Sequence, residues 1–276
     1  MAAVGAELAR CAASVERMAA ARTRTRAAQF GCWVLGTALL AWAAKGILVG
    51  DTDWSRITAS GLLRAIQRFG RVDLSLVPSL LRPALETVLM ATLGTLLGVA
   101  MALPVAFLGA NNVTPLGRLS YLAARSTMTL SRSVHEIVWG LVFVAAAGLG
   151  TLAGVLAMAV RSVGFVSKTV AEAIEDVEEG PIEALRAVGA SRLQILAFAI
   201  VPQVMPILLG NVVFEWDVNI RRSTIMGLVG AGGLGLALFR QMAAYNYGGV
   251  SAVVLVTLGL ILVGEVVSHH ARRAIL

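Results

Sequence analysis

Residues 83–108 read PALETVLMATLGTLLGVAMALPVAFL, a run in which Glu86 is the only charged side chain. A helix of about 20 mostly apolar residues is long enough to cross the hydrocarbon core of a bilayer. The rest of the chain has the same character, since 58% of its 276 residues are hydrophobic and 14% are charged. Soluble domains average about 45–50% and 25% for these two classes. One soluble core does not absorb this excess, so the composition predicts a membrane protein.

Five further apolar runs meet or approach the length of a span: residues 30–49, 134–149, 152–170, 193–214 and 250–267. The run 134–149 is short by itself, so we expect its helix to begin upstream, near Thr127. Glycines at 148, 150 and 154 then provide a tight turn into the next run. The sequence therefore predicts an all-α membrane protein with about six transmembrane helices.

The predicted spans divide the chain into a tail at 1–29, a first transmembrane helix with its extracytoplasmic connector at 30–82, and a main transmembrane domain at 83–276. Six crossings place both termini on one side, where thirteen Lys and Arg side chains flank the spans, against eight on the other side. The positive-inside rule then favours cytoplasmic termini. Within the connector, Leu62, Leu63, Ile66 and Phe69 share a helical face, which fits either an interfacial helix or a solvated connector.

The formal net charge is +7, with 23 Lys and Arg against 16 Asp and Glu. Basic side chains beside apolar spans usually contact lipid headgroups, and no basic stretch here carries the interleaved aromatic residues of a nucleic-acid platform. We therefore expect membrane lipids as a partner and no nucleic acid.

Motifs for catalysis are absent from the sequence. His135 and Glu136 begin like a zinc-protease motif, but Trp139 stands where the second histidine is required. The two lysines, Lys45 and Lys168, do not stand in a phosphate-binding Gly-Lys-Ser/Thr loop. The glycines of 230–235 match a dinucleotide fingerprint in letters only, since no buried strand precedes them. The sequence predicts no catalytic residue, metal or cofactor, and any ATP that drives this protein binds to another subunit.

Residues 171–192 interrupt the hydrophobic chain with six of its sixteen acidic side chains. Gly180 is a helix stop, Pro181 suits the first turn of a new helix, and Gly189 suits a left-handed end. Ser191 and Gln194 have the spacing of a capping box for the next span. These signals predict a short separate helix at 181–189 on the cytoplasmic side.

This short helix has an apolar face, formed by Ile182, Leu185 and Val188. No lipid lies at that depth, so the face predicts contact with a protein partner. The alternative is a solvated acidic loop, although such a loop does not need two stop signals and a cap.

The same segment resembles a known family. Glu183-Ala184-Leu185, followed by Gly189 and Pro202, is similar to the coupling motif of ABC importer permeases. With the stretches 136–144, 180–191 and 217–235, the resemblance is closest to phosphonate-type permeases, a group similar to the methionine-type ones. It covers about residues 132–276.

The resemblance implies the type I ABC importer permease fold and a multi-pass pore subunit in the bacterial cytoplasmic (inner) membrane, importing phosphonate, phosphate or a related oxyanion. It also implies three protein partners: a second copy of the chain, an extracytoplasmic phosphonate- or phosphate-binding protein, and a cytoplasmic ABC ATPase dimer that carries ATP and Mg²⁺. The residues expected to couple to the ATPase are Ile182, Glu183, Ala184, Leu185 and Gly189.

Charged side chains inside a membrane are costly and often mark a transport path. Arg161, in the fourth predicted span, and a polar cluster after the fifth have this character. For an oxyanion, arginines supply paired donors, and Asp217 is expected to hold Arg221 until the ligand displaces it. The expected path residues are Arg161, Asp217, Asn219 and Arg221. Structural ion pairs remain the alternative, above all for Glu215 and Arg222.

Other functions are compatible with parts of this pattern. A permease of the same architecture for another solute, such as methionine, shares the coupling segment. A secondary transporter works without ATP, but it needs internal inverted repeats or an ion site, and neither is visible. A membrane-anchored interaction protein is the plainest alternative.

Overall fold

The computed structural model describes residues 26, 29–46, 58–114 and 117–275, and the chain divides into two units, 1–65 and 66–276. In the first unit, residues 29–45 are α-helical and almost entirely exposed. The predicted first span continues to residue 49, beyond the described residues, and nearly all of the predicted tail also lies outside them. Helix α2 (Ala59–Gly70) confirms a helix in the connector, with Leu62, Leu63, Ile66 and Phe69 exposed.

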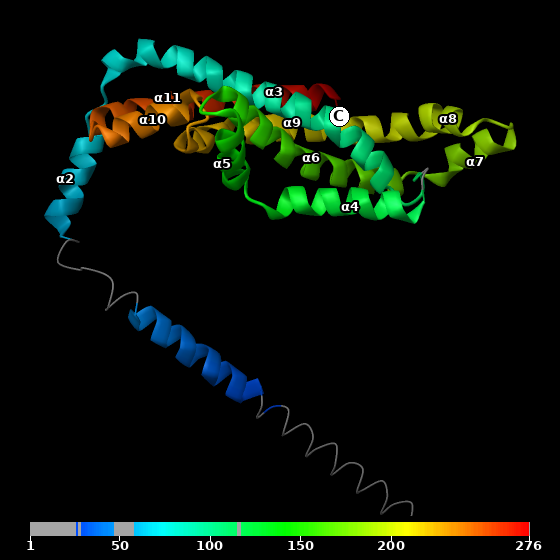
Figure 1. Ribbon diagram of the computed structural model, residues 1–276, viewed down its shortest axis with the longest axis horizontal. Helices are drawn as coiled ribbons and strands as arrows, with labels where there is room; N and C mark the ends of the chain where they lie inside the picture. Colours follow the sequence, from blue (N-terminus) through cyan, green and yellow to red (C-terminus); the bar gives the residue numbers. More distant parts are fainter. Residues whose placement is uncertain (1–25, 27–28, 47–57, 115–116, 276) are drawn as a thin grey trace, which may run out of the picture. The chain divides into compact units, whose positions relative to one another are not determined.

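The second unit is a bundle of helices, drawn in Figure 1. No strand occurs among the residues that the structure describes. After the short η3 (Leu74–Leu76), the elements in chain order are α3 (Val77–Gly109), α4 (Arg118–Ser133), α5 (Glu136–Ala147), α6 (Thr151–Glu175), α7 (Glu179–Ala187), α8 (Arg192–Ile195), the π-helical η4 (Leu196–Ile200), α9 (Val201–Met226), η5 (Gly227–Val229), α10 (Gly233–Ala243) and α11 (Tyr247–Ile275).

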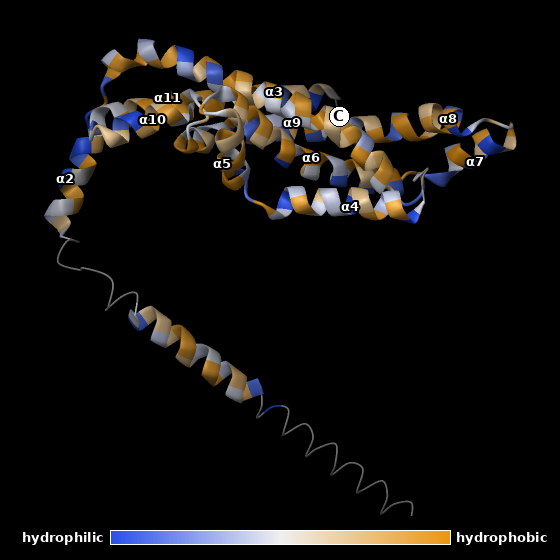
Figure 2. Cartoon of the chain, viewed as in Figure 1, coloured by the Kyte–Doolittle hydropathy of each residue, from blue (hydrophilic) through white to orange (hydrophobic). Residues whose placement is uncertain are grey.

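Helix α6 lies at the centre of the bundle, where it packs against α3, α4, α5 and α9. Small residues let α3 and α6 approach closely. A Cβ added at Gly98 would lie 2.6 Å from Ser162 Cβ, and one added at Gly94 would lie 3.0 Å from Met158 Cβ. This small-residue contact is typical of helices that associate in lipid, where packing replaces the hydrophobic effect. The outward faces of α3, α9 and α11 are apolar, as Figure 2 shows.

Four described stretches are long and apolar enough to cross a membrane: Ala59–Gly109, Thr151–Glu175, Arg192–Val229 and Tyr247–Ala274. Helices α4 and α5 together make a fifth if they form one span, but they meet at a bend of 94°. The all-α membrane fold is therefore confirmed, with four or five spans among the described residues.

The expected continuous helix from Thr127 into the third span is wrong. Helix α4 ends at Ser133, and Val134 has extended backbone angles, φ −93° and ψ 128°. His135 is also extended, and its Nδ1 atom accepts a hydrogen bond from Ile137 N at 3.3 Å, which caps α5. The tight turn predicted over glycines 148, 150 and 154 is confined to residues 148–150, since α5 ends at Ala147 and α6 begins at Thr151, so Gly154 lies within α6.

Helix α9 runs beyond the predicted end of the fifth span. The polar cluster of residues 215–222 was expected after this span, but it lies within the helix, which ends at Met226. The glycine-rich stretch then reverses the chain into α10, a helix that the sequence did not predict. Gly230 has φ +87°, and a side chain on Gly235 would overlap the backbone at Thr224. Close backbone packing therefore explains the glycines that match the dinucleotide pattern.

Candidate functional site

Four charged side chains meet inside the bundle where α5, α6 and α9 converge. We call them the inner charge cluster: Glu136, Arg161, Glu215 and Arg222. Arg222 Nη1 lies 2.8 Å from Glu215 Oε1, and Arg222 Nε lies 3.6 Å from Glu136 Oε1. Arg161 Nε lies 3.7 Å from the other oxygen of Glu136. Glu136 therefore links two arginines from different helices, and the four charges sum to zero.

The inner charge cluster is largely shielded from solvent. The exposed fraction of the side chain is 1% for Glu215, 11% for Glu136 and 19% for Arg222. Ionised groups at such depth are stable when they are paired and hydrogen-bonded. Arg161 is only partly satisfied, because its buried Nη1 atom has no hydrogen-bond partner. An unused guanidinium donor of this kind suits an additional acceptor, such as an oxygen of an anion.

Uncharged polar side chains extend the network to α3. Ser162 Oγ donates to Glu215 Oε1 at 3.0 Å. The amide of Asn219 is fully buried, and its Nδ2 atom donates to Thr95 Oγ1 at 2.9 Å and to Ser162 Oγ at 3.0 Å. Glu215, Asn219 and Arg222 are four and three residues apart, so they share one face of α9.

Asp217 and Arg221 lie on a different face of α9, toward α11. They form an ion pair with each other, and Arg221 Nη1 lies 3.3 Å from Glu265 Oε2. Asp217 is buried, whereas the side chain of Arg221 is 39% exposed. Of the four expected path residues, the structure thus places Arg161 and Asn219 in the inner network and the other two outside it. Glu136 was not among the predicted site residues. Arg222 was left with a structural ion pair as its alternative, although the 215/219/222 spacing was a usable signal for it.

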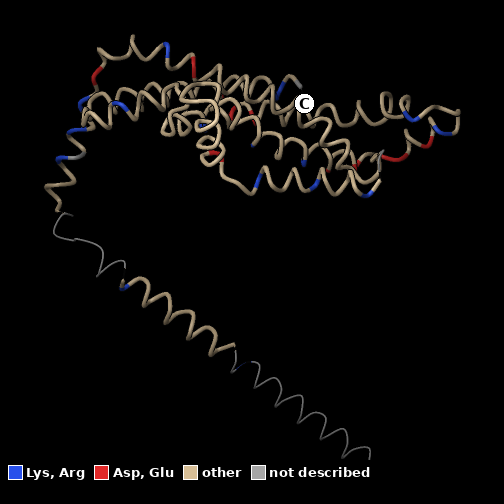
Figure 3. Tube along the Cα trace, in the orientation of Figure 1, with Lys and Arg blue, Asp and Glu red and all other residues tan. Residues whose placement is uncertain are grey.

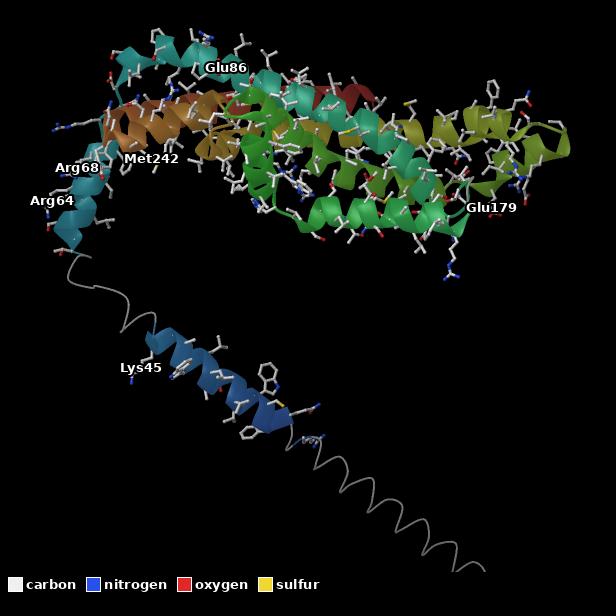
Figure 4. The ribbon with its side chains drawn as sticks, viewed as in Figure 1. Lys45, Arg64, Arg68, Glu86, Glu179 and Met242 are labelled. Carbon is white, nitrogen blue, oxygen red and sulfur yellow. The ribbon has the colours of Figure 1, made fainter. Side chains whose placement is uncertain are left out.

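The second region of interest is α7 with its flanking residues, at the end of the bundle opposite α10. Figure 4 labels Glu179, at the start of α7, and Met242, on α10, near these two ends. Helix α7 covers Glu179–Ala187, so it begins two residues before the expected start at Pro181, and Gly180 lies inside it. The expected left-handed Gly189 is present, with φ +79°. The capping box of Ser191 and Gln194 is also confirmed.

The expected apolar face of α7 is only partly available to a partner. Ile182 is 9% exposed and belongs to a core cluster of this chain, and Leu185 packs against the same cluster. Within the described residues, therefore, neither presents a free apolar surface. Val188 is 79% exposed, and Glu183 and Ala184 are exposed as well. The exposed positions of α7 thus include its three charged residues, Glu179, Glu183 and Arg186, and Figure 3 shows the charged positions along this helix.

Hydrogen bonds tie the α7 segment to the long helices. Glu178 N, at the start of α7, donates to Gln203 Oε1 of α9 at 2.9 Å. Glu175, at the end of α6, accepts from Asn111 N at 2.8 Å and from Arg125 Nη2 at 2.7 Å. These hydrogen bonds join the segment that leads into α7 to α9 and to the ends of α3 and α4.

A cavity of about 820 Å³ lies beside α7, between it and the ends of α3 and α8. Its wall includes Phe107, Val113, Ile182, Leu193 and Ile195, with charged side chains at Glu183 and Arg186. No group of three or more metal-ligating side chains occurs in the part of the chain that the structure describes.

Comparison with known proteins decides the family. Residues 94–275 match the family model of binding-protein-dependent transport system inner membrane components. The chain belongs to this family. It is thus a membrane component of a transport system and not an enzyme. The resemblance to ABC importer permeases is confirmed, and the family match begins well before residue 132.

The chain is similar to the phosphite transport system permease protein PtxC of Stutzerimonas stutzeri, with 42% identity over 73% of each chain. It is 41% identical to the phosphate-import permease protein PhnE of Mycolicibacterium smegmatis, over 68% of this chain and 35% of that protein. Permeases named for D-methionine are less similar. Among solved structures, an inward facing MetNI methionine ABC transporter matches with a TM-score of 0.65 and 23% identity, over 74% of this chain and 100% of that one. This likeness establishes the type I importer permease fold.

Proposed function

We propose that this chain is the permease subunit of an ABC importer that takes up phosphate, phosphite or a phosphonate. The observation that carries the substrate class is the pair of arginines, Arg161 and Arg222, held on Glu136 inside a membrane bundle. A buried guanidinium offers planar paired donors that match an oxyanion. The relatives named for phosphite and phosphate support the same class. An anion that reaches the cluster competes with Glu136 for these donors. When the anion binds, its oxygens replace the Glu136 carboxylate as the acceptor, and when it leaves, the carboxylate returns.

The path residues belong to this proposal. Arg161 and Asn219 lie in the inner network, and we add Arg222 to them. Asp217 and Arg221 form a second pair toward α11, where an anion is able to displace the carboxylate from the more exposed guanidinium. Because the substrate is negatively charged, each arginine along the path lowers the cost of removing it from water.

The proposed energy source is a cytoplasmic dimer of ABC ATPase subunits, which carries ATP and Mg²⁺ and contacts the α7 segment. The coupling residues are Ile182, Glu183, Ala184, Leu185 and Gly189. Their roles differ, since Glu183 and Ala184 face outward for contact, while Ile182 and Leu185 fix α7 to the bundle. A second copy of this chain completes the pore, and an extracytoplasmic binding protein delivers the oxyanion. In this proposed arrangement, α7 and both termini lie on the cytoplasmic side of the inner membrane. The spanning helices contact the membrane lipids.

Uptake of ³²P-labelled phosphate into proteoliposomes tests this function. The complex of this chain, its ATPase and its binding protein is expected to accumulate phosphate only with hydrolysable ATP. Phosphite and methylphosphonate are expected to compete, because the arginines recognise the charged oxygens that these ions share. Methionine should not compete. Uptake without nucleotide would indicate a secondary transporter, and competition by methionine alone would indicate a different solute.

A further inference from the structure

A second set of basic side chains lies outside the inner charge cluster, in a groove between α4 and α6. The groove has a volume of about 420 Å³. We call it the α4–α6 basic groove, lined by Arg125, Met128, Thr129, Arg132, Ser133, Arg161 and Lys168. Four of these seven residues are cations, and none is an acid. Figure 3 shows the basic residues recurring along α4.

The spacing of the cations follows from the two helices. Arg125 and Arg132 are seven residues apart in α4, and Arg161 and Lys168 are seven apart in α6. Seven residues are about two helical turns, or about 10 Å, so each pair lies along one face. The helices are antiparallel, because Gly164 N donates to Ser131 Oγ at 3.1 Å while Arg125 contacts Glu175. The four charges therefore form two rows that face the same groove.

The cations are unequally neutralised. Arg125 pairs with Glu175 at 2.7 Å, and Lys168 with the half-exposed Glu172 at 3.6 Å. Arg132 has no ion pair to any described residue, although the groove places it with three other cations. The buried Nη1 atom of Arg161 has no hydrogen-bond partner. Groups of like charge repel one another, so they are stabilised by a bound anion. Among the described residues, Glu175, Glu136 and Glu172 thus offset three of the four cations, and Arg132 leaves the groove with a net positive charge.

Arg161 connects the groove to the inner charge cluster, because the same side chain lines the groove and contacts Glu136. The other end of the groove, at Arg125, adjoins the ends of α3 and α6 beside the α7 segment. The groove therefore extends from the buried arginines toward the α7 end of the bundle.

We propose that the α4–α6 basic groove binds the transported phosphorus oxyanion and forms the part of its path between the inner charge cluster and the α7 end. This inference rests on the proposed function, and it adds Arg132, Lys168 and Arg125 to the path. A phospholipid headgroup offers the same phosphate chemistry. The continuity with Arg161, deep in the bundle, favours the soluble ion over the headgroup.

The test replaces Arg132 with glutamine in the reconstituted complex, in vesicles of neutral phosphatidylcholine. Phosphate uptake is expected to fall about tenfold or more, since the anion loses its charge-assisted hydrogen bonds to the Arg132 guanidinium. ATP hydrolysis stimulated by the binding protein should stay within about twofold of the unmodified complex, because the α7 segment is untouched. Lys168→Gln should reduce uptake in the same way, and Arg132→Lys should restore part of it.

Arg118→Gln is the matched control, because Arg118 is exposed on the same helix and does not line the groove. It should leave uptake unchanged. Because phosphatidylcholine itself carries a phosphate, the two sources are distinguished by measuring the affinity of the complex for ³²P-labelled phosphate in dodecyl maltoside, a detergent without phosphorus. Weaker binding by Arg132→Gln in this detergent supports the soluble ion, whereas unchanged binding there, with uptake lost only in lipid, identifies a headgroup site and overturns the proposal.

The outcomes also separate this inference from the function on which it rests. Normal uptake by both Arg132→Gln and Lys168→Gln, in a complex whose unmodified form transports phosphate, would overturn the groove alone. If the unmodified complex transports no phosphorus oxyanion, the proposed function and the groove both fail.

Discussion

Replacing Gly189 with proline is expected to reduce ATP hydrolysis in the complex to its unstimulated rate, without preventing membrane insertion. Gly189 has φ +79°, whereas the proline ring requires about −65°. The substitution also removes the hydrogen bond that Gly189 N donates to Arg186 O at 3.0 Å. The chain after α7 must then take another direction, so α7 no longer holds its position against η4 and α8.

The matched control is Gly189→Asn, because asparagine tolerates the left-handed conformation better than other side chains. It should retain most of the stimulated hydrolysis. The measurement is the ATPase rate of the purified complex with and without its loaded binding protein. Equal stimulation by the proline and asparagine variants would refute a mechanical role for this turn. Glu183→Lys, on the exposed side of α7, is expected to reduce stimulation by altering the contact itself.

Removal of Arg222 is expected to have the largest effect on stability. Arg222→Gln takes the guanidinium from two carboxylates, Glu215 at 2.8 Å and Glu136 at 3.6 Å. Breaking a buried ion pair by deleting one partner typically costs about 3–5 kcal/mol, because the remaining charge is left unpaired. The purified chain should therefore lose its folded, monodisperse form at a clearly lower temperature in detergent.

Two further variants identify the cause of this loss. Adding Glu215→Gln to Arg222→Gln removes the stranded charge and should recover much of the stability. Arg82→Gln is the control for an exposed pair, because the side chain of Arg82 is 89% exposed in its pair with Glu86, and it should cost about 1 kcal/mol or less. If Arg82→Gln were as damaging as Arg222→Gln, burial of the ion pair would not be the cause of the loss.

The sequence predicted features that depend on nearby residues. The capping box of Ser191 and Gln194 and the left-handed Gly189 both come from contacts within a few residues, and both are present. The burial of Ile182 was not predictable in this way, because it depends on side chains from α3, α6 and η4. The apolar face that suggested a partner is used largely within the chain.

The composition of the inner charge cluster also depends on long-range geometry. The sequence identified charged residues on α9 but not which of its faces points inward, so it left a structural ion pair as the alternative for Arg222. Glu136 reaches the cluster because the chain bends by 94° between α4 and α5, where a continuous helix was expected. Arg161 was predicted as an intramembrane charge because its surroundings are apolar in the sequence itself, and it lies in the apolar stretch Thr151–Glu175.

The most direct test of the account is a cross-link between α7 and the ATPase. Ala184 is exposed on α7, whereas Leu149 is exposed in the turn between α5 and α6, at the other end of the bundle. With Cys11 and Cys32 replaced by serine, Ala184→Cys is expected to form a short thiol cross-link to the ATPase in the assembled complex, and Leu149→Cys is not. Modification of Ala184→Cys in intact cells by an impermeant reagent added outside, with no cross-link to the ATPase, would contradict the account.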